Sequence, residues 1–197
     1  DQRSAQLALI SQLQEKFSTK MDMQAIYDLT GDSLRNTFNA QVVMISQYDP
    51  ITNQVFHHYA IESGQHLQIQ GWYPIDSSRL KIVQTGKPFM VSGDEIVQLV
   101  EAGKMKVIPG TELPRTWLGV PILLQDQVVG IISLQNLDKV NAFSSSDIDL
   151  LTTLTSSLSL ILENARLFTD MQKRIAHLAA LQETNKAILS TLDLNAL

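Results

Sequence analysis

The sequence predicts an α+β domain, an antiparallel sheet with flanking helices, and three patterns support this. Two apolar runs rich in Val, Ile and Leu flank the polar tip Gln125-Asp126-Gln127, which is typical of a β-hairpin. Residues 40–48 and 54–61 flank a turn signal at 49–53 and predict a second hairpin. A long helical pattern begins near Ser145, after the hairpin that contains the polar tip.

The composition limits the class of protein. With 197 residues, 44% of them hydrophobic, the chain can bury one hydrophobic core. Its net charge is −5 and both signs are interspersed, so the sequence lacks the basic patch typical of a nucleic-acid-binding protein. The absence of cysteine excludes disulfides, thiolate metal sites and cysteine nucleophiles, and it fits a reducing cytosol. No apolar run approaches the roughly 18–20 residues of a membrane span. We therefore expect a cytoplasmic protein with no membrane span in this segment.

The N-terminal region predicts two helices. Residues 4–20 place apolar side chains near helical spacing, and residues 24–38 resume the pattern after an interruption at 21–23. Asp22 is a candidate N-cap for the second helix.

Frequent Gly and Pro residues interrupt the region 62–114. We expect only short elements inside it, a helix near 79–85, a strand at 88–91 and a helix near 95–102. An irregular segment of this length inside a compact domain is usually functional.

The region from Thr116 onward contains a strand with Pro121, which an edge or a bulge can tolerate, and a long helix. Ser144 and Asp147 have capping-box spacing, with Phe143 as a hydrophobic staple. The helical pattern runs to about Thr191, which is too long to be buried on one small domain. We therefore expect a partner helix, most simply the same helix of a second copy, joined by residues 4–20.

Several motifs carry a resemblance to a known family. They are Trp117-Leu118-Gly119-Val120-Pro121-Ile122, Val129-Gly130-Ile131-Ile132-Ser133-Leu134-Gln135-Asn136, Phe143, Asp147 and Glu163-Asn164-Ala165-Arg166-Leu167-Phe168. This set resembles the C-terminal half of a GAF domain, and a weaker match extends back to about Leu9. The resemblance implies a regulatory module with a central antiparallel sheet of five to six strands (profilin-like, PAS-related). It further implies helices on one face and a ligand cavity on the other, with residues 62–114 as the lid and wall.

The resemblance divides the chain into an N-terminal signalling helix (1–21), a GAF domain (22–168) and a C-terminal linker helix (169–197). Residues 187–197 align with residues 16–26, with coinciding apolar positions and identical Asp and Ala. This repeat resembles the entry helix of a second GAF domain. We expect the segment to come from a longer signalling protein.

The sequence contains no pattern typical of a catalytic or metal site. His57 and His58 are adjacent on a predicted strand and point to opposite faces, while His66 and His177 have no spaced partner, so no metal ligand set is expected. Asp147 and Asp149, like Asp94 and Glu95, open helices, where negative charge is favourable in any case. No Ser-His-Asp arrangement or phosphate-binding glycine loop occurs.

A small-molecule site would need an apolar cavity with a few polar groups. Alternation on the strand 40–48 separates Met44, Ser46 and Tyr48 from their neighbours, and the pattern alone does not decide which set faces the irregular region. On the partner strand, alternation groups His57 with Tyr59. The candidate ligand-binding residues are Met44, Ser46, Tyr48, His57, Tyr59, Trp72, Tyr73, Arg79 and Arg115, with Trp72 the strongest single candidate.

The resemblance favours a non-catalytic sensor that binds a small molecule and relays its state through dimerising helices to a kinase or cyclase output domain. One alternative is a ligand-free dimerisation or spacer module in a tandem array. Another is cyclic-nucleotide binding, for which Asn136, Phe143 and Asp147 match, but Leu137 and Ile148 replace the Lys and Glu of that subfamily. No cofactor is expected, because bilin-binding members commonly attach the chromophore through a cysteine.

Overall fold

The structure is a computed structural model that describes residues 23–108 and 110–194, with side chains to residue 184. The chain divides into two units, residues 1–160 and residues 161–197. The predicted helix 4–20 and the candidate cap Asp22 lie outside the described residues.

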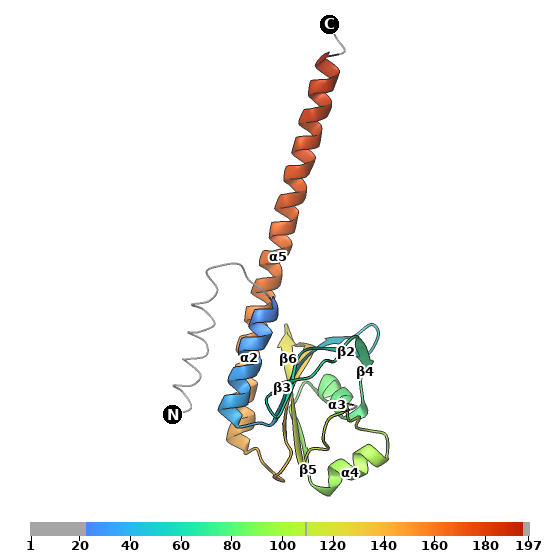
Figure 1. The fold of residues 1–197 in the computed structure, drawn as a ribbon, viewed down its shortest axis with the longest axis vertical. Helices are drawn as coiled ribbons and strands as arrows, with labels where there is room; N and C mark the ends of the chain where they lie inside the picture. Colours follow the sequence, from blue (N-terminus) through green and yellow to red (C-terminus); the bar gives the residue numbers. More distant parts are fainter. Residues whose placement is uncertain (1–22, 109, 195–197) are drawn as a thin grey trace. The chain divides into compact units, whose positions relative to one another are not determined.

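The first unit is organised around a seven-stranded antiparallel sheet (Figure 1). Its strands are β1 (Val42–Asp49), β2 (Gln54–Glu62), β3 (Gln65–His66), β4 (Trp72–Pro74), β5 (Phe89–Ser92), β6 (Thr116–Leu124) and β7 (Gln127–Asn136). The strand order is β3-β2-β1-β7-β6-β5, and β4 pairs with β2. The fold class is therefore as predicted, an α+β domain with an antiparallel sheet.

Helix α2 (Met23–Phe38) and the first turns of α5 (Ser145–Leu194) cover one face of the sheet. Leu151, Leu154 and Leu158 are buried, and the Ser159 hydroxyl donates a hydrogen bond to the carbonyl oxygen of Leu123 at the end of β6. The capping box is confirmed, since the Ser144 amide lies 2.8 Å from the Asp147 carboxylate and the Asp147 amide 3.2 Å from the Ser144 hydroxyl.

Helices α3 (Ser77–Thr85) and α4 (Asp94–Glu101) lie on the opposite face, within the region predicted to be irregular. Two apolar clusters form on this side, one of Ile82, Val91, Ile96, Met105, Trp117 and Ile131 and one of Val42, Met44 and Ala60. Both faces of the sheet are thus covered, rather than one.

A β-bulge in β2 sets which side chains share a face. Ile45 pairs with Tyr59 and Ser46 with His57, so His58 is an extra residue between them. Because of this extra residue, His57 and Tyr59 point to opposite faces, and the predicted grouping of these two side chains is wrong.

The sequence did not predict β3 and β4, which are only two and three residues long and lie in the Gly-rich part of the chain. Pro121 lies in β6, which is not an edge strand, but the pairing of β5 with β6 ends at Gly119. Pro121 therefore lies where one side of β6 has no partner strand, next to a register shift at Ile122/Leu123.

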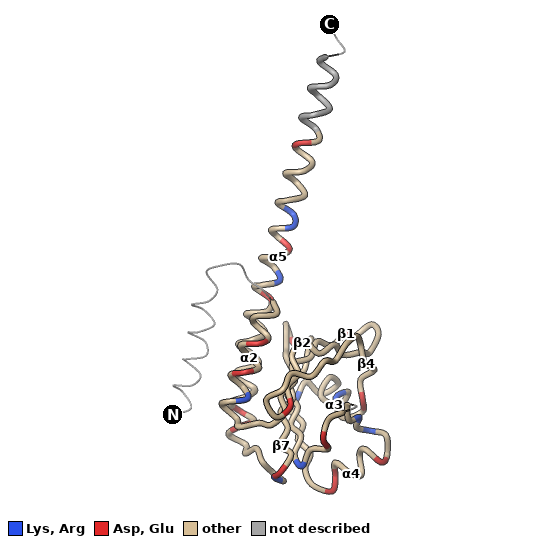
Figure 2. The backbone as a smooth tube through the Cα atoms, in the orientation of Figure 1, with Lys and Arg blue, Asp and Glu red and all other residues tan. Residues whose placement is uncertain are grey.

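The second unit is the continuation of α5, a helix of 50 residues in all. Charges of both signs follow one another along its described part, from Glu163 to Glu183 (Figure 2). Several large apolar side chains of this unit are exposed, namely Leu167, Phe168, Met171, Ile175, Leu178 and Leu181. Among the described residues, no helix is both long and apolar enough to cross a membrane.

Candidate functional site

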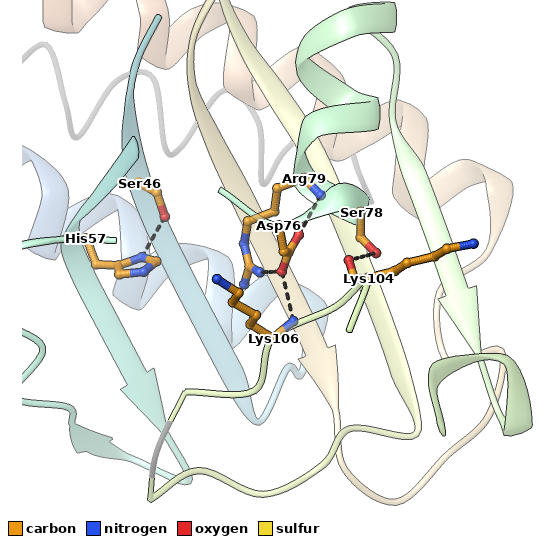
Figure 3. A network of polar contacts seen from close by, with 7 residues as sticks. All are labelled: Ser46, His57, Asp76, Ser78, Arg79, Lys104 and Lys106. Atoms are coloured by element: carbon orange, nitrogen blue, oxygen red, sulfur yellow. Dashed lines mark hydrogen bonds and ion pairs between the residues drawn. The ribbon is translucent and has the colours of Figure 1, made fainter. Parts of the chain in front are cut away.

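The start of α3 is built around a buried carboxylate. Asp76, 5% exposed, is the N-cap of the helix and accepts the Arg79 amide at 2.8 Å. The same carboxylate forms an ion pair with the Arg79 guanidinium and accepts the Lys106 amide at 3.1 Å (Figure 3). Arg79, itself only 8% exposed, is thus held as a buried cation beside its counter-ion.

The segment 104–106 is attached to α3 by two residues. Asp76 holds the Lys106 amide, and the Ser78 amide donates to the Lys104 carbonyl oxygen at 3.1 Å, with the Ser78 hydroxyl at 3.3 Å. This segment, which follows α4, is therefore fixed against the first turn of α3.

A small cavity lies between α3, the segment 105–108 and the sheet. Its volume is about 20 Å³ and it is lined by Met44, Arg79, Met105, Lys106, Val107, Ile108, Thr111, Pro114, Trp117 and Gln135. This volume suits about one water-sized group, well below the several hundred Å³ of a typical drug-sized ligand site. In this conformation, the space is mostly filled by the protein's own side chains.

Trp117 is the largest of these side chains and is 2% exposed. A Cβ on Gly119 would lie 2.4 Å from the Trp117 ring, so glycine at that position leaves room for the indole to lie along β6. The Arg79 guanidinium lies 5.5 Å from the ring centroid, within cation–π range. The indole Nε1 is buried and has no hydrogen-bond partner among the described residues.

His57 and Ser46 form a polar pair on the same face of the sheet. The Ser46 hydroxyl lies 2.8 Å from His57 Nδ1. Burial, together with the positive charges of Arg79 and His58, lowers the pKa of His57 to about 4. The ring is therefore neutral near pH 7, and one of its nitrogens carries no proton.

The structure brings only some of the predicted site residues to this cavity. Met44 and Arg79 line it. Ser46, His57, Tyr48 and Tyr73 share the same face of the sheet without lining the cavity; the Tyr48 hydroxyl bonds to Asn53, and Tyr73 lies 6.0 Å from His57. Arg115 is exposed next to the cavity residue Pro114. Of the two orientations left open, Met44, Ser46 and Tyr48 face the region 62–114.

Tyr59 and Trp72 lie on the other face, away from this cavity. The Tyr59 hydroxyl donates to Asp32 of α2 at 2.7 Å, and its ring lies where a Cβ on Gly31 would be. Trp72 pairs with Phe56, whose ring is 5.6 Å from the indole and 4.9 Å from His58. His58 in turn stacks on Tyr27 of α2. The bulge at His58 and the pairing of β4 explain why the structure does not group these residues with Met44.

Trp117, Gln135 and Lys106 line the cavity but were not among the predicted site residues. Trp117 and Gln135 are cross-strand partners, and Gln135 also pairs with Val42, so they share a face with Met44. A polar Gln inside the apolar run of β7 was the available sequence signal. The sequence around Lys106 did not predict that it lines the cavity, because its position depends on the hydrogen bond from its backbone amide to Asp76.

The carboxylates considered in the sequence analysis lie at the starts of helices. Asp147 caps α5, and Asp94 and Glu95 occupy the first turn of α4. Asn136 Oδ1 accepts the amides of Asp138 and Lys139, and Phe143 is buried. The positions shared with cyclic-nucleotide binders are therefore accounted for by a turn, a core residue and a cap. In the described part of the chain, no three His, Cys, Asp or Glu side chains gather as a metal site would require.

The sheet order and the helices on both faces define an α+β fold that the comparisons assign to a family. The model of the GAF domain family matches residues 22–162, so the chain belongs to the GAF family. GAF domains are in general regulatory.

A curated relative is the circadian input-output histidine kinase CikA of Thermosynechococcus vestitus, 21% identical over 189 residues. The match covers 90% of this chain and 26% of that protein, so the chain spans about a quarter of its relative. This chain is therefore similar to part of a signal-transduction histidine kinase.

Solved structures with the same fold include the GAF domain of a phosphoenolpyruvate-protein phosphotransferase from Coxiella burnetii, with a TM-score of 0.65 and 16% identity. That alignment covers 83% of this chain and 96% of the other. Free methionine-R-sulfoxide reductase from Neisseria meningitidis, solved with its substrate, has a TM-score of 0.61 and 16% identity over 81% of this chain and 89% of its own. The fold thus also occurs in an enzyme.

Proposed function

We propose that this domain is a non-catalytic, cytoplasmic sensor that binds a small molecule in the cavity beside α3 and relays its state through α5. The observation that carries the proposal is Trp117, which lines that cavity and whose buried indole Nε1 is a donor without a partner among the described residues. Buried Trp N–H groups usually find an acceptor, and a ligand atom can supply one.

The segment 104–106 supplies a means of response. It borders the cavity and is held by the Asp76 carboxylate, by Ser78, by the Leu99 carbonyl and by the buried Met105 side chain. A ligand that prefers one arrangement of this segment shifts the population toward it by no more than its difference in affinity. This segment lies within residues 62–114, which the family resemblance predicts as lid and wall, and we propose it as the part that moves.

The output of the sensor is a pair of α5 helices in a parallel homodimer. Phe168, Met171, Ile175 and Leu178 follow one another by three, four and three residues, which is heptad spacing, and all are exposed in the single chain. A second copy of α5 would bury them. The relative CikA is a histidine kinase, and we infer a kinase or cyclase as the output domain of the longer protein.

Ligand binding can be tested by mass spectrometry of compounds that co-purify with the chain. A thermal-shift panel of nucleotides, amino acids, organic acids and haem completes the test. A genuine ligand raises the unfolding midpoint as its concentration increases. A midpoint that does not move with any compound, with nothing co-purified, would contradict the sensor proposal.

The relay can be tested by disulfide cross-linking, because the chain has no cysteine of its own. Leu178→Cys should cross-link rapidly in a parallel dimer, whereas Glu183→Cys, off the heptad stripe, should react slowly. A ligand found in the panel should change the Leu178→Cys rate. Equal rates for the two variants would contradict the helix pair.

One observation favours the alternative of a ligand-free dimerisation or spacer module. The cavity is only about 20 Å³, because Trp117 and the methionines occupy the space. A spacer module should cross-link through α5 in the same way but show no ligand response. The same volume disfavours cyclic-nucleotide binding, since a nucleotide is far larger than this cavity.

A further inference from the structure

We propose that the ligand of the cavity beside α3 is a small organic carboxylate, whose oxygens accept hydrogen bonds from Trp117 Nε1 and interact with Lys106. The inference rests on the proposed sensor function and specifies its ligand class. Three properties of the cavity carry it: the inventory of donors in its wall, its net charge and its size.

The polar groups of the wall are dominated by donors. Trp117 offers one N–H, Arg79 a guanidinium and Lys106 an ammonium group, and Gln135 adds an amide. Trp117 and Arg79 are each more than nine-tenths buried, so bulk water is not at hand to accept hydrogen bonds from their N–H groups. An ionised carboxylate is acceptor-only, and it is therefore the complement of such a wall.

Asp76, the acidic side chain that contacts the lining residues Arg79 and Lys106, does not oppose an anion. A second carboxylate, Glu62, accepts the Glu112 amide beside the lining residue Thr111 and is itself outside the lining. The Asp76 carboxylate already accepts from the Arg79 amide, the Arg79 guanidinium and the Lys106 amide. Arg79 and Asp76 neutralise each other, so Lys106, which is exposed to solvent, is the remaining charge of the lining. His57, with a pKa lowered to about 4, adds no charge near pH 7.

The size of the cavity favours a small member of the class. At about 20 Å³ it suits one water-sized group, and a carboxylate head is only slightly larger. Met44, Met105 and Ile108 supply apolar lining on which a short alkyl tail can pack, with small shifts of the flexible methionines. A tetrahedral phosphate or a nucleotide would need a larger opening.

The experiment follows the two indole N–H resonances of the ¹⁵N-labelled chain, assigned with Trp72→Phe. Sodium formate, acetate and propionate are titrated at constant ionic strength, with acetamide as the uncharged isostere and inorganic phosphate as the larger anion. We expect acetate to move the Trp117 resonance saturably and to leave the Trp72 resonance unchanged. Acetamide should bind about tenfold more weakly, because a charge-assisted hydrogen bond is stronger than a neutral one.

A matched pair of variants makes the test independent of folding. Lys106→Gln should weaken acetate binding about tenfold. Lys104→Gln should leave it unchanged, because Lys104 is exposed like Lys106 but does not line the cavity. The inference is overturned if the Trp117 resonance does not respond, if acetamide or phosphate matches acetate, or if both lysine variants behave alike. A neutral compound that binds as tightly as acetate would overturn the carboxylate and leave the sensor proposal standing. No response to these probes and none to the compounds of the thermal-shift panel would contradict both proposals.

Discussion

Asp76 allows the energetics of the candidate site to be tested by substitution. Its carboxylate caps α3, neutralises the buried Arg79 and holds the Lys106 amide. Removing one partner of a buried ion pair costs about 3–5 kcal/mol, because the other charge stays buried without compensation. Losing an Asp N-cap costs about 1 kcal/mol more.

Two substitutions separate these terms. Asp76→Asn keeps an acceptor for the α3 amides but loses the charge, so it should lower the free energy of unfolding by about 3 kcal/mol. Asp76→Ala loses both and should cost about 4 kcal/mol or more. Urea unfolding followed by circular dichroism measures both values, with the slope m unchanged if the denatured state is the same.

The control is a double-mutant cycle with Arg79→Met, which removes the buried cation. In that background Asp76→Asn should cost about 1 kcal/mol or less, because no unpaired charge remains. A cost that stays near 3 kcal/mol would show that the stability does not come from the ion pair. In Asp76→Ala the Lys106 amide should also exchange its hydrogen faster, since its acceptor is gone.

Further predictions concern the rest of the first unit. Gly31→Ala should destabilise by about 1–2 kcal/mol, because overpacking against the Tyr59 ring outweighs the better helix propensity of alanine, and in a Tyr59→Ala background the sign should reverse in the same urea assay. Because the folded pKa of His57 lies below its usual value, the unfolded state binds more protons between about pH 4 and 6.5. The stability should therefore fall by up to about 2–3 kcal/mol as the pH drops through this window, and His57→Gln should flatten the profile. Ser144→Ala should cost about 1 kcal/mol through loss of the capping box, measured by thermal unfolding, and an unchanged midpoint would contradict that cap.

The two hairpins and the capped start of α5 could be predicted from the sequence because their signals are local. A polar tip between apolar runs, or Ser and Asp at capping-box spacing, specifies its own structure. The confirmed Ser144–Asp147 contacts illustrate this. The short strands β3 and β4 gave no such signal, because they exist only through pairing with β2.

The candidate site was harder to predict because it depends on register. Strict alternation on β2 would place His57 and Tyr59 on one face, but a single extra residue, His58, separates them. The extra residue is stabilised from outside the strand: the His58 ring stacks on Tyr27, its Nε2 lies 2.9 Å from Gln47 Oε1, and its carbonyl accepts from Gln24. None of these contacts can be inferred from the strand's own sequence.

Strand β6 suggests how occupancy of the cavity could reach α5. Trp117 lies in its first half, and the Leu123 carbonyl near its end accepts the Ser159 hydroxyl of α5, with the register shift at Ile122/Leu123 directly before that contact. If the proposed relay runs through β6, Ser159→Ala should leave the acetate-dependent shift of the Trp117 resonance intact while abolishing the effect of acetate on Leu178→Cys cross-linking. Ser156→Ala is the matched control, since that hydroxyl bonds only within α5, to the Thr152 carbonyl. Loss of the cross-linking response in both variants, or in neither, would mean that the signal does not pass through the Leu123–Ser159 contact.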